Sequence, residues 1–199
     1  MKAFIVYCHP SEDSFTAEVR DSFIRGLESG GHGYLLSDLY KMNFNSDMSE
    51  AEYRREAFYN TALPVPADVL AEQEKINSCG AIVFIYPVFW SEAPAKLVGW
   101  FDRVWTFGFA YGEGRTMKTL EKGLAIVSAG NTLEYFNRTG IGEAMKKVFL
   151  GDRLFDRVKR KEMIILDATS RELAERKANR EKHLKRAFDA GAALGEPLL

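Results

Sequence analysis

Hydrophobic residues along this chain alternate between short unbroken runs and longer stretches in which they recur every three or four positions. Strong runs occupy residues 3–8, 81–86, 124–127 and 163–166, and a weaker run occupies residues 34–37. Uncharged runs of this length are typical of parallel strands whose two faces are covered by helices. The pattern therefore predicts five buried strands.

The segments between the runs have helical spacing. Apolar positions recur at that spacing over residues 15–27, 65–76 and 97–104, and over a longer, charged segment at 173–194. Strands that alternate with helices indicate βαβ units and a parallel sheet. Five strands and about five helices predict one α/β domain over residues 1–199. The expected architecture is the flavodoxin-like three-layer sandwich, with strand order 2-1-3-4-5 and helices on both faces of the sheet.

Two stretches interrupt this alternation. Residues 41–66 form a long connection with a predicted short helix over 49–59, where Ser49 and Glu52 have the spacing of a capping box. Residues 107–122 are irregular and contain glycines. Long connections inside compact α/β domains are often functional, but a plain surface excursion is equally compatible with the sequence.

The chain turns from the first strand into the first helix at residues 9–15, which read His-Pro-Ser-Glu-Asp-Ser-Phe. The first N–H groups of a helix lack internal partners and lie at the positive end of its dipole, so they favour phosphate. The hydroxyls of Ser11, Ser14 and Thr16 and the ring of His9 would add donors. An ordinary helix cap is the alternative, because this turn has no glycine and matches neither a dinucleotide nor a Walker fingerprint.

Aromatic residues follow the strand predicted over residues 81–86. Pro87 ends that run, and Pro94 suits the first turn of the next helix, where a missing N–H costs nothing. Phe89 and Trp90 would then stand at the carboxyl end of a central strand, which is where open α/β sheets bind ligands. An aromatic ledge at that position suits a planar heterocycle.

Small residues follow the fourth strand. Ser128, Ala129, Gly130 and Asn131 would let the backbone approach a ligand closely, and the last two suit a tight turn. The N–H groups of such a turn suit the N1/C2=O edge of a flavin, although a plain loop is the alternative. Three strand ends of one sheet thus offer a phosphate seat, an aromatic ledge and a donor turn.

Composition narrows the class of protein. The 199 residues carry a formal net charge of −1, which argues against a nucleic-acid partner and an anionic membrane surface. No apolar run approaches the roughly 20 residues of a membrane helix, and Met1 leads directly into a strand without a signal peptide. Cys8 and Cys79 match no metal spacing. We therefore predict a cytoplasmic protein with reduced thiols, no metal, and His183 on the surface of its charged C-terminal helix.

Two longer runs resemble a known family. Residues 37–45 read Ser-Asp-Leu-Tyr-Lys-Met-Asn-Phe-Asn, and residues 99–104 read Gly-Trp-Phe-Asp-Arg-Val. With the first strand turn, the loop at 87–94 and the Phe-Ala-Tyr run at 109–111, they resemble the NAD(P)H:quinone oxidoreductases related to DT-diaphorase. The resemblance spans most of the chain. Because the mammalian C-terminal extension is absent, the chain is most similar to the short bacterial members.

The resemblance implies a flavin cofactor, either FAD or FMN, and NAD(P)H as co-substrate. It implies that a hydride passes from NAD(P)H through flavin N5 to a quinone-like acceptor by ping-pong kinetics. It also implies a homodimer with the active site at the interface, where Trp90 and Tyr111 line the substrate pocket and no side chain is required as a catalytic acid. The implied flavin contacts are His9, Ser14, Phe15, Thr16, Pro87, Val88, Phe89, Trp90, Ser91, Ser128, Ala129, Gly130 and Asn131.

The sequence also departs from that family. Mammalian members carry a tyrosine and a histidine after the fourth strand, whereas residues 135–142 contain no histidine and Tyr135 is out of register. The connection over residues 47–66 is also shorter, which leaves both FAD and FMN open. Nitro- or azo-compound reduction and a flavin-binding regulatory subunit of a transport system are alternative functions. The near-neutral charge disfavours an electron-carrier flavodoxin.

Overall fold

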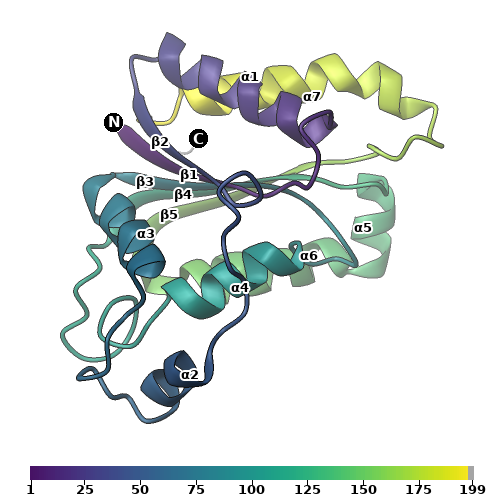
Figure 1. The fold of residues 1–199 in the computed structure, drawn as a ribbon. Coiled ribbons are helices and arrows are strands. Elements are labelled where there is room, and N and C mark those ends of the chain that lie inside the picture. The colour runs from purple at the N-terminus through teal and green to yellow at the C-terminus, as the bar shows by residue number, and fades with distance from the viewer. Residues whose placement is uncertain (197–199) are drawn as a thin grey trace.

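A computed structural model describes residues 1–196 and contains a five-stranded parallel sheet. The strand order is β2-β1-β3-β4-β5, as predicted (Figure 1). The strands are β2 Gly33–Asp38, β1 Lys2–Tyr7, β3 Ala81–Pro87, β4 Leu120–Ser128 and β5 Val158–Leu166. Every residue of β3 is buried, which explains why its sequence is an unbroken apolar run.

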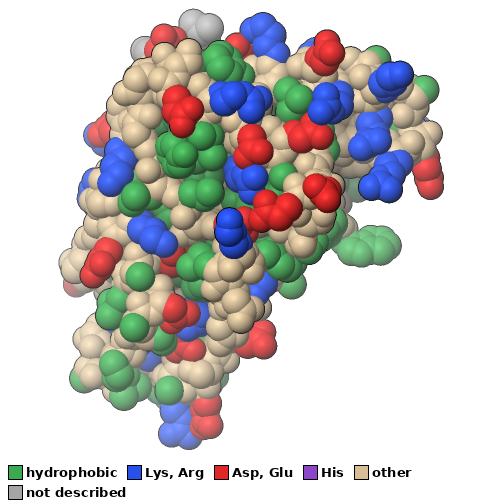
Figure 2. Space-filling model, turned by 45° about the horizontal axis from the view of Figure 1, so that its top comes forward, with side chains coloured by type: hydrophobic (Ala, Val, Ile, Leu, Met, Phe, Trp, Pro, Cys, Tyr) green, Lys and Arg blue, Asp and Glu red, His purple; other side chains and the backbone are tan. Residues whose placement is uncertain are grey.

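Helices cover both faces of the sheet, which is the middle of three layers (Figure 1). Helices α1, Phe15–Ser29, and α7, Glu175–Ala192, lie side by side on one face. Helices α3, Ala67–Ser78, and α4, Ala95–Val104, lie on the other face. The predicted flavodoxin-like architecture is therefore confirmed. Lys and Arg side chains alternate with Asp and Glu over the layer of α1 and α7 (Figure 2).

The backbones of α1 and α7 approach each other very closely. A Cβ atom at Gly26 would lie 2.1 Å from the carbonyl oxygen of Phe188, and one at Gly191 would lie 2.3 Å from that of Phe23. No side chain fits at either distance, so this helix pair requires glycine at both positions.

His183 lies on the buried face of α7 and is only 2% exposed. Its Nε2 atom lies 2.9 Å from the carbonyl oxygen of Asp167, and burial lowers the pKa of the ring. The surface position expected for His183 is wrong. The charged residues around it in the sequence belong to the exposed face of the same helix, and they concealed the buried one.

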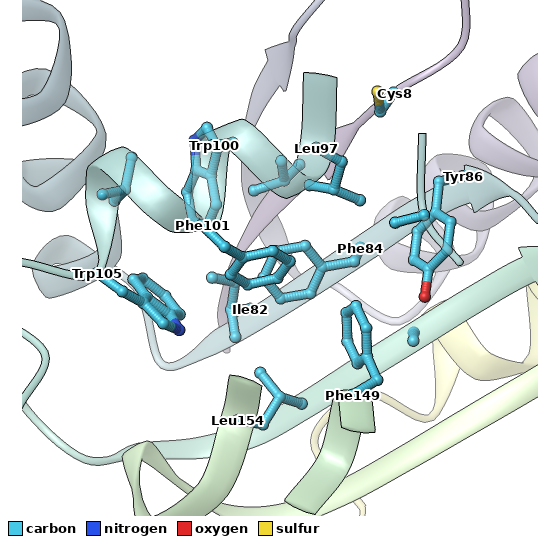
Figure 3. Close-up of a cluster of buried hydrophobic side chains, with 14 of the residues drawn as sticks. Cys8, Ile82, Phe84, Tyr86, Leu97, Trp100, Phe101, Trp105, Phe149 and Leu154 are labelled. Carbon is cyan, nitrogen blue, oxygen red and sulfur yellow. The ribbon is translucent and has the colours of Figure 1, made fainter. Parts of the chain in front are cut away.

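The opposite face of the sheet holds the larger hydrophobic cluster. Phe84 from β3 packs against Trp100 and Phe101 from α4, with ring centroids 5.7 and 5.0 Å apart, and against Phe149 at 5.3 Å (Figure 3). Tilted and edge-on arrangements of this kind are those that aromatic rings prefer. The Gly-Trp-Phe-Asp-Arg-Val run that carries the family resemblance therefore builds the core.

The long connection after β2 is fastened to α4. Its short helix α2, Glu50–Ala57, begins at the predicted capping box: the Ser49 hydroxyl accepts from the Glu52 N–H, and the Glu52 carboxylate accepts from the Ser49 N–H. The Arg103 guanidinium donates to Glu52 at 2.7 Å and to Asp68 at 2.6 Å. Arg103 thereby ties α2, α3 and α4 together.

Residues 133–154 hold helical segments that the sequence analysis did not predict. They are α5 Leu133–Thr139, α6 Ile141–Lys146 and the π-helical η1 Lys147–Leu154, followed by a 3-10 turn, η2 Phe155–Arg157. Gly140, with a φ of 73°, separates the first two. The buried residues of η1, Phe149 and Leu154, are five positions apart, a spacing that a search for α-helical periodicity does not detect.

Several boundaries also differ from those predicted. β4 begins at Leu120 and β5 at Val158, earlier than expected, because charged residues directly follow the first residue of each strand and interrupt the apolar pattern. Pro94 stands at the N-cap of α4 and not within its first turn. At either position its missing N–H leaves no helical hydrogen bond unmade.

Over residues 1–196, no helix is both long enough and apolar enough to cross a bilayer. Within the same range, no three His, Cys, Asp or Glu residues are arranged to hold a metal ion. Cys8 and Cys79 are buried, and both are free thiols. The cytoplasmic location stays a prediction, as does a single domain over residues 1–199.

Candidate active site

The carboxyl ends of β1, β3 and β4 lie side by side, and Ser128 joins the loops that follow them. The Ser128 hydroxyl lies 2.8 Å from the hydroxyl of Thr16, in the first turn of α1. The Ser128 carbonyl accepts a 2.8 Å hydrogen bond from the N–H of Val88, in the loop after β3. The three segments predicted to bind a ligand therefore form one continuous surface at one edge of the sheet.

The turn after β1 leaves backbone donors free at the start of α1. The Ser14 hydroxyl caps the helix by accepting from the Ala17 N–H at 3.1 Å, and the Thr16 hydroxyl is engaged with Ser128. No residue in the described range accepts a hydrogen bond from the N–H of Phe15 or Thr16. These two donors lie at the positive end of the helix dipole. An anion at this position would therefore be bound mainly by backbone.

His9 lies in the same turn. Its Nδ1 atom is 3.0 Å from the Ser11 nitrogen and 2.9 Å from the Ser11 oxygen, which fixes this side of the ring. Burial lowers the pKa of His9, so the ring is neutral at pH 7 and one of its two nitrogens carries a proton. Glu12 and Asp13 are both exposed, so solvent screens their charges from an anion at the helix end.

The loop after β3 is a tight turn that holds an aromatic side chain in solvent. Pro87 ends β3 and is buried. Phe89 and Glu92 exchange two backbone hydrogen bonds of 2.9 Å, which close a four-residue turn around Trp90 and Ser91. Trp90 is fully exposed, at 101% of its reference area, and Phe89 is 46% exposed. We call this feature the Trp90 turn.

The backbone of the Trp90 turn is strained. Trp90 and Ser91 have φ angles of 52° and 64°, a region that costs residues other than glycine about 1–2 kcal/mol each. Glu92 anchors the turn, because its carboxylate accepts from the Ala93 N–H at 2.7 Å and pairs with Arg153 at 2.9 Å. Strain that the surroundings hold in place is typical of functional positions. Arg153 belongs to η1, so no sequence signal pointed to this anchor.

The turn after β4 presents two more backbone donors. Ala129 is fully buried and its N–H donates to the Leu166 carbonyl at 2.9 Å. The Asn131 carbonyl accepts from Ala168 at 2.8 Å, which fixes the other end of the turn. Within residues 1–196, no acceptor meets the N–H of Gly130 or Asn131. Both residues are exposed, so these donors are accessible to a ligand.

Tyr111 lies apart from this surface. Its hydroxyl donates to the Glu56 carboxylate at 2.9 Å, and burial together with Glu56 raises the pKa of Tyr111 to about 12. It lines a separate pocket of about 480 Å³ with Arg115, Phe155 and Arg157 among its neighbours, and no residue of the three loops lines that pocket. Within one chain, Tyr111 is not brought to the other predicted site residues.

The same arrangement of strands and loops occurs in proteins already known. A family model described as a flavodoxin-like fold matches residues 1–189. This chain belongs to the flavodoxin-like family. A solved member, the NAD(P)H:quinone oxidoreductase from Methanothermobacter marburgensis, is similar to it with a TM-score of 0.92 and 44% identity. The similarity covers 100% of this chain and 99% of that one. The predicted resemblance to this group of flavodoxin-like proteins is thus confirmed.

Curated flavodoxin-like relatives are longer than the region that aligns with this chain. Ribosyldihydronicotinamide dehydrogenase-like protein traD from Penicillium crustosum is 30% identical over an alignment of 176 positions, which covers 74% of this chain and 64% of that protein. NAD(P)H dehydrogenase (quinone) 1 from Rattus norvegicus is 33% identical over an alignment of 123 positions, which covers 55% of this chain and 45% of that protein. The chain therefore spans about half to two thirds of the length of these relatives.

Proposed function

We propose that this protein is a flavin-dependent NAD(P)H dehydrogenase that reduces quinones or similar electrophiles. One observation carries the proposal: three neighbouring strand-end loops, joined through Ser128, present unpaired backbone donors beside a fully exposed tryptophan. Ligands of open α/β sheets bind at such strand ends. The similarity to a quinone oxidoreductase over the whole chain supports the same activity.

The donors of the site match the chemical groups of a flavin. The free N–H groups of Phe15 and Thr16, with His9 beside them, would bind its phosphate. The free N–H groups of Gly130 and Asn131 would donate to the carbonyl oxygens of its pyrimidine edge. The backbone of the loop over residues 87–91 would border its ring. FAD and FMN both carry a phosphate and these carbonyl oxygens, so either cofactor suits the described donors.

When bound, a flavin supplies two-electron redox chemistry between NAD(P)H and an acceptor. The protein positions both partners. Trp90 has an exposed indole face on which a nicotinamide or a quinone ring would stack. Because the same face serves both, the two substrates would bind in turn, which predicts ping-pong kinetics. Water or a tyrosine such as Tyr111 would supply the protons for the reduced acceptor, so no other side chain is required as a general acid.

Tyr111 supports a homodimer as the active form. The pocket that it lines with Phe155 contains none of the residues of the three loops. A second copy that set this aromatic pocket against the Trp90 turn would complete a closed substrate site. This arrangement gives Tyr111 the substrate contact that the sequence predicts.

The absorption spectrum of the purified protein, followed by anaerobic addition of NADPH or NADH, tests the proposal. We expect visible flavin bands that bleach on addition and return when a quinone is added. Chromatography of the released cofactor would distinguish FAD from FMN. A protein that stays colourless after incubation with both flavins would overturn the flavin assignment. Flavin bands that neither nucleotide bleaches would instead overturn the dehydrogenase activity.

A further inference from the structure

A second pocket lies between the Trp90 turn, α6 and η1, and we call it the side pocket. It has a volume of about 170 Å³. Its apolar walls include Ile141, Ala144 and Met145 from α6, Phe149 from η1 and Met163 from β5. Apart from Ser91, none of the predicted flavin contacts lines this pocket, and neither does Tyr111.

The size and lining of the side pocket match a small apolar group. An apolar protein cavity of about 150 Å³ binds benzene in preference to water, and the side pocket is of similar volume. Two of its walls are methionines, Met145 and Met163, whose flexible thioether side chains adapt to ligands of different shape. One carbocyclic ring or a short alkyl chain would fill it.

One hydroxyl in this lining has no protein partner. Tyr86 lines the side pocket and is only 2% exposed, yet its hydroxyl makes no hydrogen bond with any residue of the described range. Its ring packs beside Phe149, with centroids 5.6 Å apart (Figure 3). Burial raises the pKa of Tyr86, so the hydroxyl remains protonated and can donate. The hydroxyl is therefore free to donate to a ligand oxygen in the side pocket.

The side pocket adjoins the candidate active site. Ser91 and Glu92 belong to the Trp90 turn and also line the pocket. The ion pair of Glu92 with Arg153, at 2.9 Å, fixes the turn to η1 and so holds this shared wall in place. A ligand stacked on Trp90 would therefore reach the side pocket by passing Ser91.

We propose that the side pocket binds an apolar, oxygen-bearing extension of the electron acceptor, and that the Tyr86 hydroxyl donates a hydrogen bond to that oxygen. The proposal rests on the proposed function, because it assigns the substrate class of the same site. It favours acceptors with two parts: a reducible ring that stacks on Trp90, and a second ring or short alkyl arm that enters the side pocket. Bicyclic quinones would then be preferred to monocyclic ones.

Methionine methyl signals test binding without turnover. Of the six methionines, Met145 and Met163 line the side pocket, whereas Met42 and Met117 do not. The flavin-loaded protein, labelled with carbon-13 at its methionine methyl groups, would be titrated with 2-methyl-1,4-naphthoquinone in the absence of NAD(P)H. We expect the Met145 and Met163 signals to shift and the other two to remain in place. Shifts at Met42 and Met117 alone, or none at all, would contradict the proposal.

Selectivity between acceptors provides a second test. Ala144→Phe fills the pocket from an exposed helical position, and Tyr86→Phe removes only the hydroxyl. We expect the ratio of kcat/KM for 2-methyl-1,4-naphthoquinone over 1,4-benzoquinone to fall about tenfold in the first variant and about fivefold in the second. Lys147→Phe is the matched control, because it adds the same ring on the neighbouring, exposed surface outside the pocket.

The experiments distinguish an error in the side pocket assignment from an error in the proposed function. If NAD(P)H bleaches the flavin but neither the methyl signals nor the selectivity ratio responds, the side pocket assignment is wrong and the proposed function stands. If the methyl signals shift in a protein that takes up no flavin, the proposed function is wrong.

Discussion

Two polar regions of this molecule differ in how far their hydrogen bonds are satisfied. In the network beneath the sheet, the fully buried Glu72 accepts from Ser37 at 2.8 Å, Lys75 at 2.6 Å and Trp100 at 2.9 Å. At the strand ends, in contrast, the N–H groups of Phe15, Thr16, Gly130 and Asn131 have no partner in the described range, and Trp90 is exposed to solvent. Glu72 is paired within the chain and hidden from any ligand, whereas the second region has several unpaired donors to offer.

This difference separates residues that define the fold from residues that define the function. The two most specific runs of the family resemblance, 37–45 and 99–104, contribute Ser37 and Trp100 to the network around Glu72. The second run also contributes Arg103 to another satisfied cluster, with Glu52 and Asp68. They identify the scaffold because a buried charge must be paired within the chain itself. The strand-end loops contribute little to that identification, yet they carry the proposed chemistry.

The largest effect is expected from breaking the cluster of Arg103, Glu52 and Asp68. Arg103→Met would leave the Glu52 carboxylate without its buried partner and release Asp68, both of which pair with Arg103 within 2.7 Å. Removing one member of such a pair costs about 3–5 kcal/mol. Chemical denaturation should show this loss in the free energy of unfolding. The flavin affinity of the protein that remains folded should change little.

The pH dependence of this loss has a definite sign. Although burial alone would raise it, hydrogen bonds from Ser49 and Arg103 hold the pKa of Glu52 below its usual value, and Arg103 likewise lowers that of Asp68. A lowered pKa stabilises the fold above the ordinary pKa and loses that stability as pH falls through the folded value. The difference between wild type and variant should therefore shrink in acid. Arg54→Met, which breaks an exposed pair with Glu50, is the control and should cost under about 0.5 kcal/mol.

At the strand ends, a substitution should weaken ligand binding and leave the stability of the fold almost unchanged. Trp90→Ala removes a side chain that touches solvent only, so the free energy of unfolding should stay within about 0.5 kcal/mol. The Kd of the flavin or the KM of the acceptor should rise about tenfold, because an aromatic pair contributes up to about 1.5 kcal/mol. Phe58→Ala is the control, because it removes an exposed aromatic side chain outside the candidate site. Unchanged flavin content and turnover in Trp90→Ala would remove the tryptophan from the site.

The sequence predicted those parts of the fold in which the hydrophobic residues follow a standard strand or helix pattern. All five strands were predicted because parallel strands buried on both faces read as apolar runs. The segment over residues 133–154 was missed, since Gly140 divides it and the π-helical spacing of Phe149 and Leu154 matches neither standard period. Arg153, which anchors the Trp90 turn, lies in this segment, so the anchor was missed with it.

The sequence predicted which loops form the candidate site, but not the contacts that join these loops. Turn chemistry at strand ends is local, so the loops containing His9, Trp90 and Gly130 could be found from the sequence. That Ser128 joins these loops depends on strand order and on a hydroxyl 112 positions from its partner Thr16. No spacing along the chain encodes that contact. The side pocket was also missed, because its walls come from segments with no shared motif.

A smaller effect is expected from separating the loops. Ser128→Ala removes the 2.8 Å contact between the hydroxyls of Ser128 and Thr16. It leaves the hydroxyl of Thr16, a residue that is only 2% exposed, without a partner. The loss should be about 1 kcal/mol of unfolding free energy, accompanied by a rise of about threefold in the Kd of the flavin. Ser78→Ala, which removes an exposed hydroxyl that donates to the Lys75 carbonyl, should change only stability. Equal flavin affinity in both variants would show that the Ser128 junction has no part in the site.

The smallest effect concerns Tyr111, which shares a feature with each region: its hydroxyl is satisfied by Glu56, but its ring lines an open pocket. Tyr111→Phe should cost about 0.5–1 kcal/mol through the lost hydrogen bond. Because the pKa of Tyr111 is raised from 10 to about 12, its stabilisation is fully present below pH 10 and is lost as pH rises toward 12. Denaturation of both proteins between pH 8 and pH 11 measures this difference, which should be constant at first and then narrow. A difference that widened with pH would mean that Glu56 does not hold the tyrosine, and Tyr111 would then be free to serve the substrate site alone.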